Sequence, residues 1–204
     1  MAVEFWFEFA STYSYPAAMR IEAAAAQHGV SIVWRPFLLG PIFKQEGWND
    51  SPFNIYPAKG RYMWRDLARI CADLELPLRK PSVFPRNGLL AARVACLHAD
   101  AAWLPAFVRA VYRANFSRDQ DISAVAVVTD CLQQAGQNPP TVLAATESPE
   151  AKEKLRQQTE RAIHLGIFGA PSFVVNGELF WGNDRMESAF RWALTNPPRQ
   201  PTIG

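Results

Sequence analysis

Residues 3–37 decide the fold, and they read VEFWFEFASTYSYPAAMRIEAAAAQHGVSIVWRPF. At the start of this stretch, apolar side chains alternate with Glu4, Trp6 and Glu8, which is the period of a strand. The Ala-rich run that follows favours a helix that stops at Gly29. Residues 31–37 have the composition of a second strand. The stretch therefore predicts a β-α-β unit.

The turn between the first strand and the helix carries several hydroxyl groups. Pro16 is tolerated only in a first helical turn, where its missing N–H costs little. The helix is therefore expected to begin between Thr12 and Tyr15, with Ser11 at its mouth.

The middle of the chain is mostly helical. Gly, Pro, Asn and Asp are scattered through residues 40–57, which predicts an irregular segment. Beyond it, apolar positions follow a helical period in five stretches, at residues 61–76, 88–100, 102–116, 122–136 and 150–166.

The C-terminal part returns to strands. SFVV and ELFW flank Asn176-Gly177, which predicts a hairpin with a two-residue turn. A last helix is expected over 184–194, with Asp184 as its N-cap, followed by a Pro-rich, loose tail over 196–204.

The predicted order is β-α-β, a helical block, then β-β-α. It indicates an α/β fold of the thioredoxin type with an all-helical insertion. The thioredoxin-like domain would be discontinuous, formed by residues 1–39 and 167–204, and the helical insertion would span 40–166.

Composition limits the possible functions. The chain has 204 residues, of which 49% are hydrophobic, which suits a buried core and argues against disorder. Its net charge is 21 − 19 = +2, and without a dense Lys/Arg run we expect no nucleic-acid partner. The three cysteines form no CxxC and the three histidines are scattered, so we expect neither a disulfide framework nor a metal. We also expect no membrane span and, without a secretory signal, a cytoplasmic location.

Three features mark a site, and each has an ordinary structural explanation. Ser11 lies at a helix start, where backbone N–H groups favour an anion such as a thiolate, although helix capping alone explains a serine there. Pro171, in Gly169-Ala170-Pro171, precedes a strand; in a thioredoxin-type sheet such a proline is usually cis, although a turn proline is the commoner case. Asn183 and Asp184 open the last helix and could bind ammonium and carboxylate groups, or simply cap it.

Five motifs in this order resemble one family: FEFASTYSYPA (7–17), YPAKGRYMWRDLAR (56–69), FPRN (84–87), FGAPSF (168–173) and WGNDR (181–185). The family is that of the 2-hydroxychromene-2-carboxylate isomerases, DsbA-like thioredoxin-fold enzymes related to the kappa-class glutathione transferases. The resemblance reaches from the N-terminus to about Leu194. Thr12 and Pro16 depart from it, because the family often has Pro and Leu at these positions.

The resemblance implies glutathione as cofactor and a role for each matching residue. Ser11 would hydrogen-bond the glutathione sulfur. Ala170, before the proposed cis-Pro171, would pair with the cysteinyl unit through its backbone. Asn183 and Asp184 would bind the γ-glutamyl end, and Asn54 and Lys59 would reach glutathione from the other side. For the substrate, the expected residues are Arg86 and Trp181, with Phe43, Trp48 and Tyr62 as further candidates for an aromatic wall and Lys44 as a further cation.

The function implied is a reversible, glutathione-dependent isomerisation of a small aromatic carboxylate, between a chromene carboxylate and a benzylidenepyruvate-like compound, in aromatic catabolism. The resemblance also implies a homodimer. The alternatives are a kappa-type transferase or peroxidase that consumes glutathione, a disulfide oxidoreductase, and a non-catalytic glutathione- or peptide-binding module. The oxidoreductase would need a CxxC, whereas Ser11 and Ser14 stand at those positions.

Overall fold

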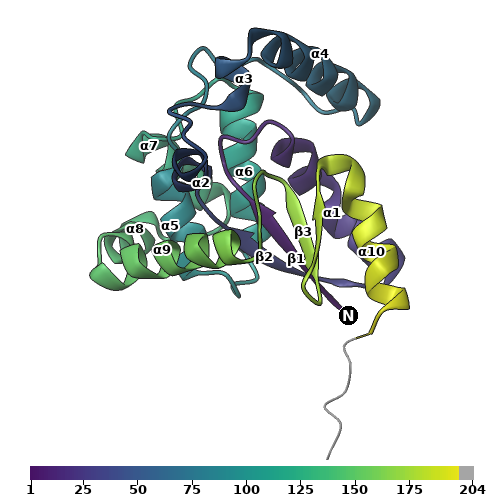
Figure 1. The fold of residues 1–204 in the computed structure, drawn as a ribbon. Coiled ribbons are helices and arrows are strands. Elements are labelled where there is room, and N and C mark those ends of the chain that lie inside the picture. Colours follow the sequence, from purple (N-terminus) through teal and green to yellow (C-terminus); the bar gives the residue numbers. More distant parts are fainter. Residues whose placement is uncertain (198–204) are drawn as a thin grey trace, which may run out of the picture.

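The computed structural model describes residues 1–197, and its centre is one mixed four-stranded sheet in the order β2-β1-β3-β4 (Figure 1). The strands are β1 (Ala2–Phe7), β2 (Ser31–Pro36), β3 (Ser172–Val175) and β4 (Glu178–Trp181). β1 pairs in parallel with β2 and antiparallel with β3, and β3 pairs antiparallel with β4. The predicted α/β thioredoxin-like fold with a helical insertion is confirmed.

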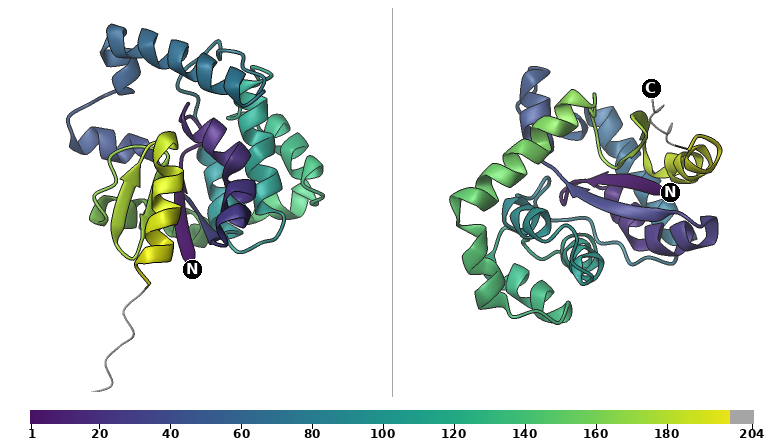
Figure 2. Two further views of the ribbon diagram at one scale, coloured as in Figure 1. Left: turned by 90° about the vertical axis from the view of Figure 1, so that its right-hand side faces the viewer. Right: turned by 90° about the horizontal axis from the view of Figure 1, so that it is seen from below.

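Helices cover both faces of this sheet. They are α1 (Ser14–His28), α2 (Leu39–Gln45), α3 (Pro52–Ile55), α4 (Pro57–Asp73), α5 (Leu89–Leu97), α6 (Leu104–Phe116), α7 (Val125–Gln134), α8 (Pro139–Thr146), α9 (Pro149–His164) and α10 (Met186–Thr195), with a short 3-10 helix η1 (Asn183–Arg185). Figure 2 shows strands from both ends of the chain side by side in the sheet, with the other helices around it.

The alternation along β1 divides the core in two. Phe5 lies opposite Trp34 of β2 and Phe173 of β3, and these rings belong to the main core together with residues of α1, α6 and α10. Trp6 points to the other face, where it packs in a smaller cluster with Ile42 of α2 and residues of α9. β1 is thus covered on both sides, and its C-terminal end leads directly into the turn at Ser11.

Two turns have the backbone conformations that the sequence predicts. Gly29 ends α1 in the left-handed conformation, with φ of 65°. Asn176 and Gly177 have φ of 51° and 87°, the positive pair that a type I′ hairpin turn requires, and they join β3 to β4 as predicted.

The middle of the chain contains the five predicted helices as α4, α5, α6, α7 and α9, but the prediction of an irregular segment over 40–57 was wrong. α2 and α3 lie within it, and α8 was not predicted. Pro41, Pro52 and Pro57 stand in first helical turns, where proline is tolerated, whereas Gly47 lies in the turn after α2. Burial of Ile42 then stabilises α2 against the sheet.

Asp184 is not the N-cap of the last helix, because η1 precedes α10 and neither has a side-chain cap. The division of the chain at residues 40 and 166 stays a prediction, and residues 198–204 of the expected tail lie outside the described part. None of the helices in residues 1–197 has the length and apolarity needed to cross a bilayer.

Candidate active site

Ser11 lies in the turn that joins β1 to α1. Its hydroxyl donates a hydrogen bond to the carbonyl oxygen of Ala170, with 2.8 Å between Oγ and O, and accepts one from the Ser14 N–H at 3.3 Å. Ser11 therefore serves the helix start, as the capping interpretation predicts. It also contacts a residue 159 positions away, at the beginning of β3.

The Ala170–Pro171 peptide bond is cis, as expected for a proline at this place in the fold. The Pro171 carbonyl accepts from the Gly182 N–H at 2.9 Å, which ties the loop to the end of β4. Within residues 1–197 the Ala170 N–H has no hydrogen-bond partner. This free N–H lies two residues before β3, and it offers one backbone donor to an extended peptide.

The start of α1 offers further donors to a ligand. In the described part of the chain no acceptor is found for the N–H groups of Thr12 and Tyr13, and the buried Thr12 hydroxyl is also unpaired. Such groups favour an anion. The protein itself has no thiolate to place there, because its three cysteines are buried and burial raises the pKa of each thiol to about 11.

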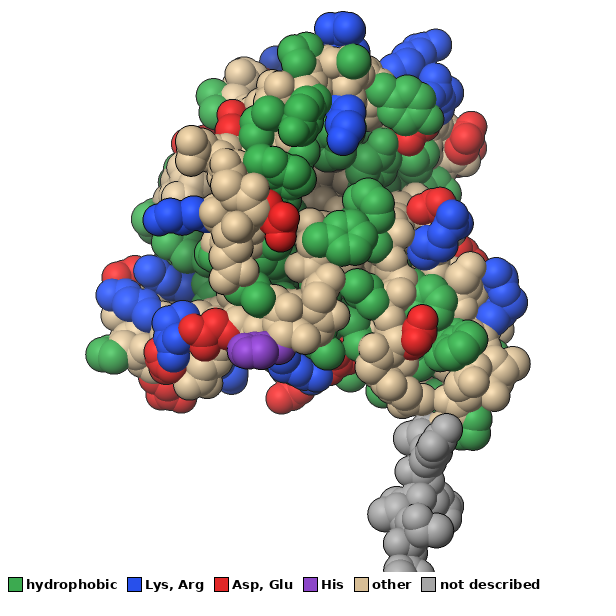
Figure 3. Space-filling view, viewed as in Figure 1, with side chains coloured by type: hydrophobic (Ala, Val, Ile, Leu, Met, Phe, Trp, Pro, Cys, Tyr) green, Lys and Arg blue, Asp and Glu red, His purple; other side chains and the backbone are tan. Residues whose placement is uncertain are grey.

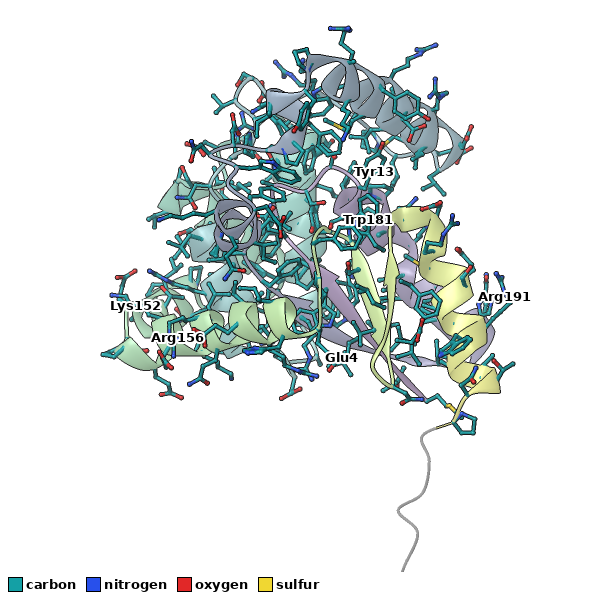
Figure 4. All side chains as sticks on the ribbon, in the orientation of Figure 1. Glu4, Tyr13, Lys152, Arg156, Trp181 and Arg191 are labelled. Atoms are coloured by element: carbon teal, nitrogen blue, oxygen red, sulfur yellow. The ribbon has the colours of Figure 1, made fainter. Side chains whose placement is uncertain are left out.

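A cavity of about 730 Å³ opens above this turn, a volume that suits a small-molecule site. It lies between the C-terminal end of β1, the loop before β3 and the segment from α2 to α4. On this face hydrophobic side chains gather between α4 and the strand ends (Figure 3). Tyr13 and Trp181, which both line the cavity, lie at the end of the sheet below α4 (Figure 4).

An aromatic pair forms one rim of the cavity. The rings of Phe168 and Trp181 lie 4.8 Å apart between centroids, and each side chain is 51% exposed. Gly169 makes this arrangement possible, since a Cβ on it would lie 2.4 Å from the indole nitrogen of Trp181. Trp181 thus lies on the cavity wall, and its role toward a substrate stays a prediction. Phe168 was not singled out, although FGAPSF contained it.

The opposite wall is built by the segment from α2 to α3. Phe43 and Trp48 pack with ring centroids 5.8 Å apart, and Phe53 packs against Tyr13 at 6.3 Å. Phe43 and Trp48, two of the candidates for an aromatic wall, line the cavity. Tyr62 does not, because it is 63% exposed on α4, where its ring faces Arg69.

The predicted cations differ in their surroundings. Lys59 lines the cavity and lies 4.9 Å from the centre of the Tyr56 ring. Arg86 also lines it, but its guanidinium donates to Asn115, Ser82 and Asp119 and is 5% exposed. Hydrogen bonds from Ser82 and Arg86 lower the pKa of Asp119 to about 2. Lys44 is exposed on α2 outside the lining.

The amide of Asn54 bridges two loops instead of facing the cavity. It donates to the Asp50 carboxylate at 3.0 Å and to the Phe84 carbonyl at 3.0 Å, next to a cis Phe84–Pro85 bond that no pattern predicted. Its neighbours in sequence, Phe53 and Asp50, do line the cavity.

Asn183 and Asp184 lie just past Trp181, outside the cavity lining. Arg20 of α1 donates to the Asn183 side chain at 3.3 Å and to its carbonyl at 2.7 Å. Asp184 is exposed and pairs with Arg185 at 3.0 Å. Both therefore stand at the surface next to the aromatic rim.

Glu8 is a lining residue that the sequence did not single out. Burial raises the pKa of its carboxyl to about 8, against smaller lowering effects of the Ala10 and Ser11 N–H groups. Its place in the strand alternation was visible in the sequence, but nothing there distinguished it from Glu4.

These groups together fit glutathione. They are an unpaired strand-edge N–H at Ala170, a hydroxyl at Ser11 and free helix-start donors for a sulfur anion. In residues 1–197 no three His, Cys, Asp or Glu side chains are placed to hold a metal ion.

Comparison with known proteins finds relatives that match most of the chain. A family model described as DSBA-like thioredoxin domain matches residues 2–190. The 2-hydroxychromene-2-carboxylate isomerase of Sphingobium xenophagum is 30% identical over 91% of this chain and 94% of its own length. Glutathione S-transferase kappa 1 of Homo sapiens is 28% identical, over 91% of this chain and 87% of the relative.

A solved 2-hydroxychromene-2-carboxylate isomerase structure superposes with a TM-score of 0.82 at 26% identity, covering 96% of this chain and 98% of that one. The resemblance indicated by the five motifs is therefore confirmed, and the relatives that span the chain are enzymes.

Proposed function

The chain belongs to the DSBA-like thioredoxin domain family, and on that premise we propose that it is a glutathione-dependent isomerase of the 2-hydroxychromene-2-carboxylate isomerase type. Its substrate is a small aromatic carboxylate, converted between a chromene carboxylate and a benzylidenepyruvate-like compound. The names of the relatives support isomerase chemistry and the use of glutathione.

One observation carries the proposal: the Ser11 hydroxyl contacts the carbonyl of the residue before the cis proline, beside an unpaired N–H. In an enzyme that used its own sulfur this position would hold a cysteine. Here the three cysteines are buried elsewhere with raised pKa values, so a reacting sulfur comes from the ligand. The same fact argues against a disulfide oxidoreductase.

The residues take the following roles. The Ala170 backbone, held by cis-Pro171, pairs with the cysteinyl unit. Asn183 and Asp184 bind the γ-glutamyl end. On binding, the Asp184 carboxylate gives up its ion pair with Arg185 and pairs with the ammonium group of the ligand. Lys59 binds a carboxylate across the cavity, and Asn54 holds the loop beside it. Trp181 stacks on the aromatic substrate, and Arg86 contributes by fixing the loop that closes the cavity over it.

When bound, glutathione supplies a sulfur nucleophile whose reversible addition turns a conjugated double bond into a single bond that rotates freely. The chain favours the ionised sulfur through the Ser11 hydroxyl and the free N–H groups at the start of α1. Ser11 is a donor in this account and never a nucleophile. The aromatic walls exclude water from the reacting atoms.

A spectrophotometric assay with 2-hydroxychromene-2-carboxylate, with and without glutathione, tests the proposal. Turnover that requires glutathione and leaves its concentration unchanged is the expected result. Absence of turnover despite glutathione binding would favour a non-catalytic binding module.

The second candidate is a kappa-type transferase or peroxidase, which the 28% identity to the human kappa enzyme favours. The same site would then consume glutathione. Stoichiometric loss of free thiol during turnover distinguishes this chemistry from isomerisation.

A further inference from the structure

We propose that Glu8 is the acid–base residue of this cavity, giving a proton from its carboxyl to the carbonyl oxygen of a conjugated substrate and taking it back. The inference rests on the proposed function and adds a proton-transferring group to a site in which Ser11 serves only as a donor to sulfur.

Glu8 differs from the other glutamate on the same side of β1. Glu4 accepts hydrogen bonds from Arg35 and Arg161 in ion pairs, at 3.1 and 2.6 Å. For Glu8, by contrast, no cation lies within ion-pair distance anywhere in the described chain. Its carboxyl is therefore not explained by an ion pair that stabilises the fold.

The two carboxyl oxygens of Glu8 have different surroundings. Oε2 accepts from the Ala10 N–H at 2.9 Å. Oε1 accepts no hydrogen bond from residues 1–197, and Glu8 is one of the residues that line the cavity. Oε2 thus fixes the carboxyl, and Oε1 is left to meet a ligand.

The loop after FPRN closes over this carboxyl. A Cβ on Gly88 would lie 3.6 Å from Oε1 of Glu8 and 2.8 Å from the Cβ of Phe9, so the backbone there approaches as closely as only glycine allows. Arg86, held by Asp119 and Asn115, fixes the same loop. The loop removes water from one side of Glu8 while the other side faces the cavity.

Ser11 and Glu8 stand at the two ends of a single turn. The Ser11 N–H donates to the Glu8 carbonyl oxygen at 3.0 Å, and Tyr112 of α6 donates its hydroxyl to the same oxygen at 2.9 Å. These bonds fix the backbone of the turn, and both Ser11 and Glu8 line the same cavity. We infer that a ligand whose sulfur meets Ser11 brings its reacting end to the Glu8 carboxyl.

The surroundings favour a neutral carboxyl. Burial raises the pKa of Glu8 to about 8, so Glu8 keeps its proton at pH 7 and releases it within reach of that pH, as an acid–base residue must. The titratable groups that face it are Tyr112 from α6 and, around the cavity, Tyr13, Asp50, Lys59 and Arg86.

The proton transfer balances. When a C–S bond forms at the far carbon of the conjugated double bond, the C=C electron pair would shift to the bond beside the carbonyl carbon and the C=O pair to the oxygen, which Glu8 protonates by breaking its O–H bond. When the C–S bond breaks, these shifts reverse, and the Glu8 carboxylate recovers the same proton. No proton is gained or lost over a cycle, and no oxidant or reductant is needed.

The test uses Glu8→Gln, which preserves the size of the side chain and an acceptor for the Ala10 N–H but cannot transfer a proton. We expect kcat to fall about 100-fold or more, with the glutathione Kd changed less than about threefold. Glu178→Gln, the same change at an exposed site on β4, should leave kcat unchanged. A Glu8→Gln kcat within threefold of wild type would overturn the proposal.

The carboxyl can also be observed without turnover. In protein labelled with ¹³C at glutamate Cδ, one resonance that is absent from Glu8→Gln should titrate with a midpoint near 8. Bound glutathione should raise that midpoint, since a nearby thiolate disfavours a second negative charge. A midpoint near the ordinary value of about 4.3 with and without glutathione would contradict the proposal. If Glu8→Gln does not fold, the glutamate resonance that is present in wild type and absent from Glu8→Asp identifies Glu8, and its titration midpoint decides between the two outcomes.

Failure of this inference is distinguishable from failure of the proposed function. If wild type binds glutathione and isomerises the substrate while Glu8→Gln does so equally well, only the Glu8 role is wrong. If wild type binds no glutathione, the function proposed above is wrong, and the role of Glu8 in it is wrong as well.

Discussion

The hydroxyl of Ser11 and the carbonyl oxygen of Ala170 lie 2.8 Å apart and are hydrogen-bonded, joining the turn before α1 to the loop before β3. The donor that would meet a sulfur is thus held by a carbonyl that an extended peptide would also use. In the proposed mechanism, pairing of a ligand N–H with Ala170 would free the hydroxyl to turn about its Cβ–Oγ bond toward the sulfur. We therefore expect docking of the peptide and activation of its thiol to be linked through this one contact.

Replacing Ser11 by Ala should therefore affect the thiol more than the fold. Loss of a hydrogen bond to a charged group corresponds to about a tenfold to hundredfold decrease in kcat. The pKa of the bound thiol, followed by thiolate absorbance in the ultraviolet, should rise in Ser11→Ala. Ser188→Ala, on the α10 surface, is the control and should change neither quantity. An unchanged thiol pKa in Ser11→Ala would remove Ser11 from the mechanism.

Gly169 should tolerate no side chain, because its missing Cβ leaves room for the indole of Trp181. In Gly169→Ala the ring must move away from Phe168, which opens the rim of the cavity and weakens binding of an aromatic carboxylate about tenfold. Tryptophan fluorescence and ligand titration report both changes. Gly40→Ala, on the α2 side of the same cavity, is the matched control, since a Cβ there meets nothing within 4 Å and displaces no side chain. Equal ligand affinity in the two variants would contradict the account of the rim.

Arg86 should matter for stability more than its neighbour Arg79. Both approach Asp119, but Arg86 is 5% exposed and Arg79 is 68% exposed. Removing Arg86, a buried side chain with several hydrogen bonds, should cost more stability than removing Arg79, whose exposed ion pair contributes little. Urea unfolding of Arg86→Met and Arg79→Met measures the difference. Similar midpoints for the two variants would show that the Arg86 network does not support the loop.

Glu8 should make stability depend on pH. The unfolded chain releases this proton near pH 4.5, while the folded protein keeps it up to about pH 8. The folded state thus binds more protons in this window, and the free energy of unfolding falls as pH rises through it. Glu8→Gln should therefore gain stability relative to wild type between pH 4 and pH 9, by on the order of 5 kcal/mol. Denaturant unfolding at both pH values measures this, and a difference independent of pH would contradict it.

Much of the fold could be predicted from local patterns. The alternation in residues 3–9 gave β1, Gly29 marked the end of α1, and Asn176-Gly177 marked the hairpin. α2 could not be predicted, because Gly40 and Pro41 weaken its local preference and Ile42 stabilises it only when packed against Trp6. Local helix propensity gives no information about a tertiary contact of this kind.

The site was predictable where a motif fixed the backbone and less so where tertiary contacts decide the side chain. Ser11 and Pro171 follow from a turn and a strand start, and both lie where expected. Arg86 shows the limit, since only the fold reveals that Asp119 and Asn115 hold its guanidinium. Glu8 shows the same limit. Its pKa is raised by burial in the fold, and the alternating pattern of residues 3–9 does not distinguish Glu8 from Glu4.

Titration calorimetry with glutathione tests the central claim most directly, using wild type, Asp184→Ala and Glu178→Gln. We expect one binding site in wild type, affinity lowered about tenfold or more in Asp184→Ala, and no change in Glu178→Gln. No binding of glutathione by wild type at millimolar concentration would contradict the assignment.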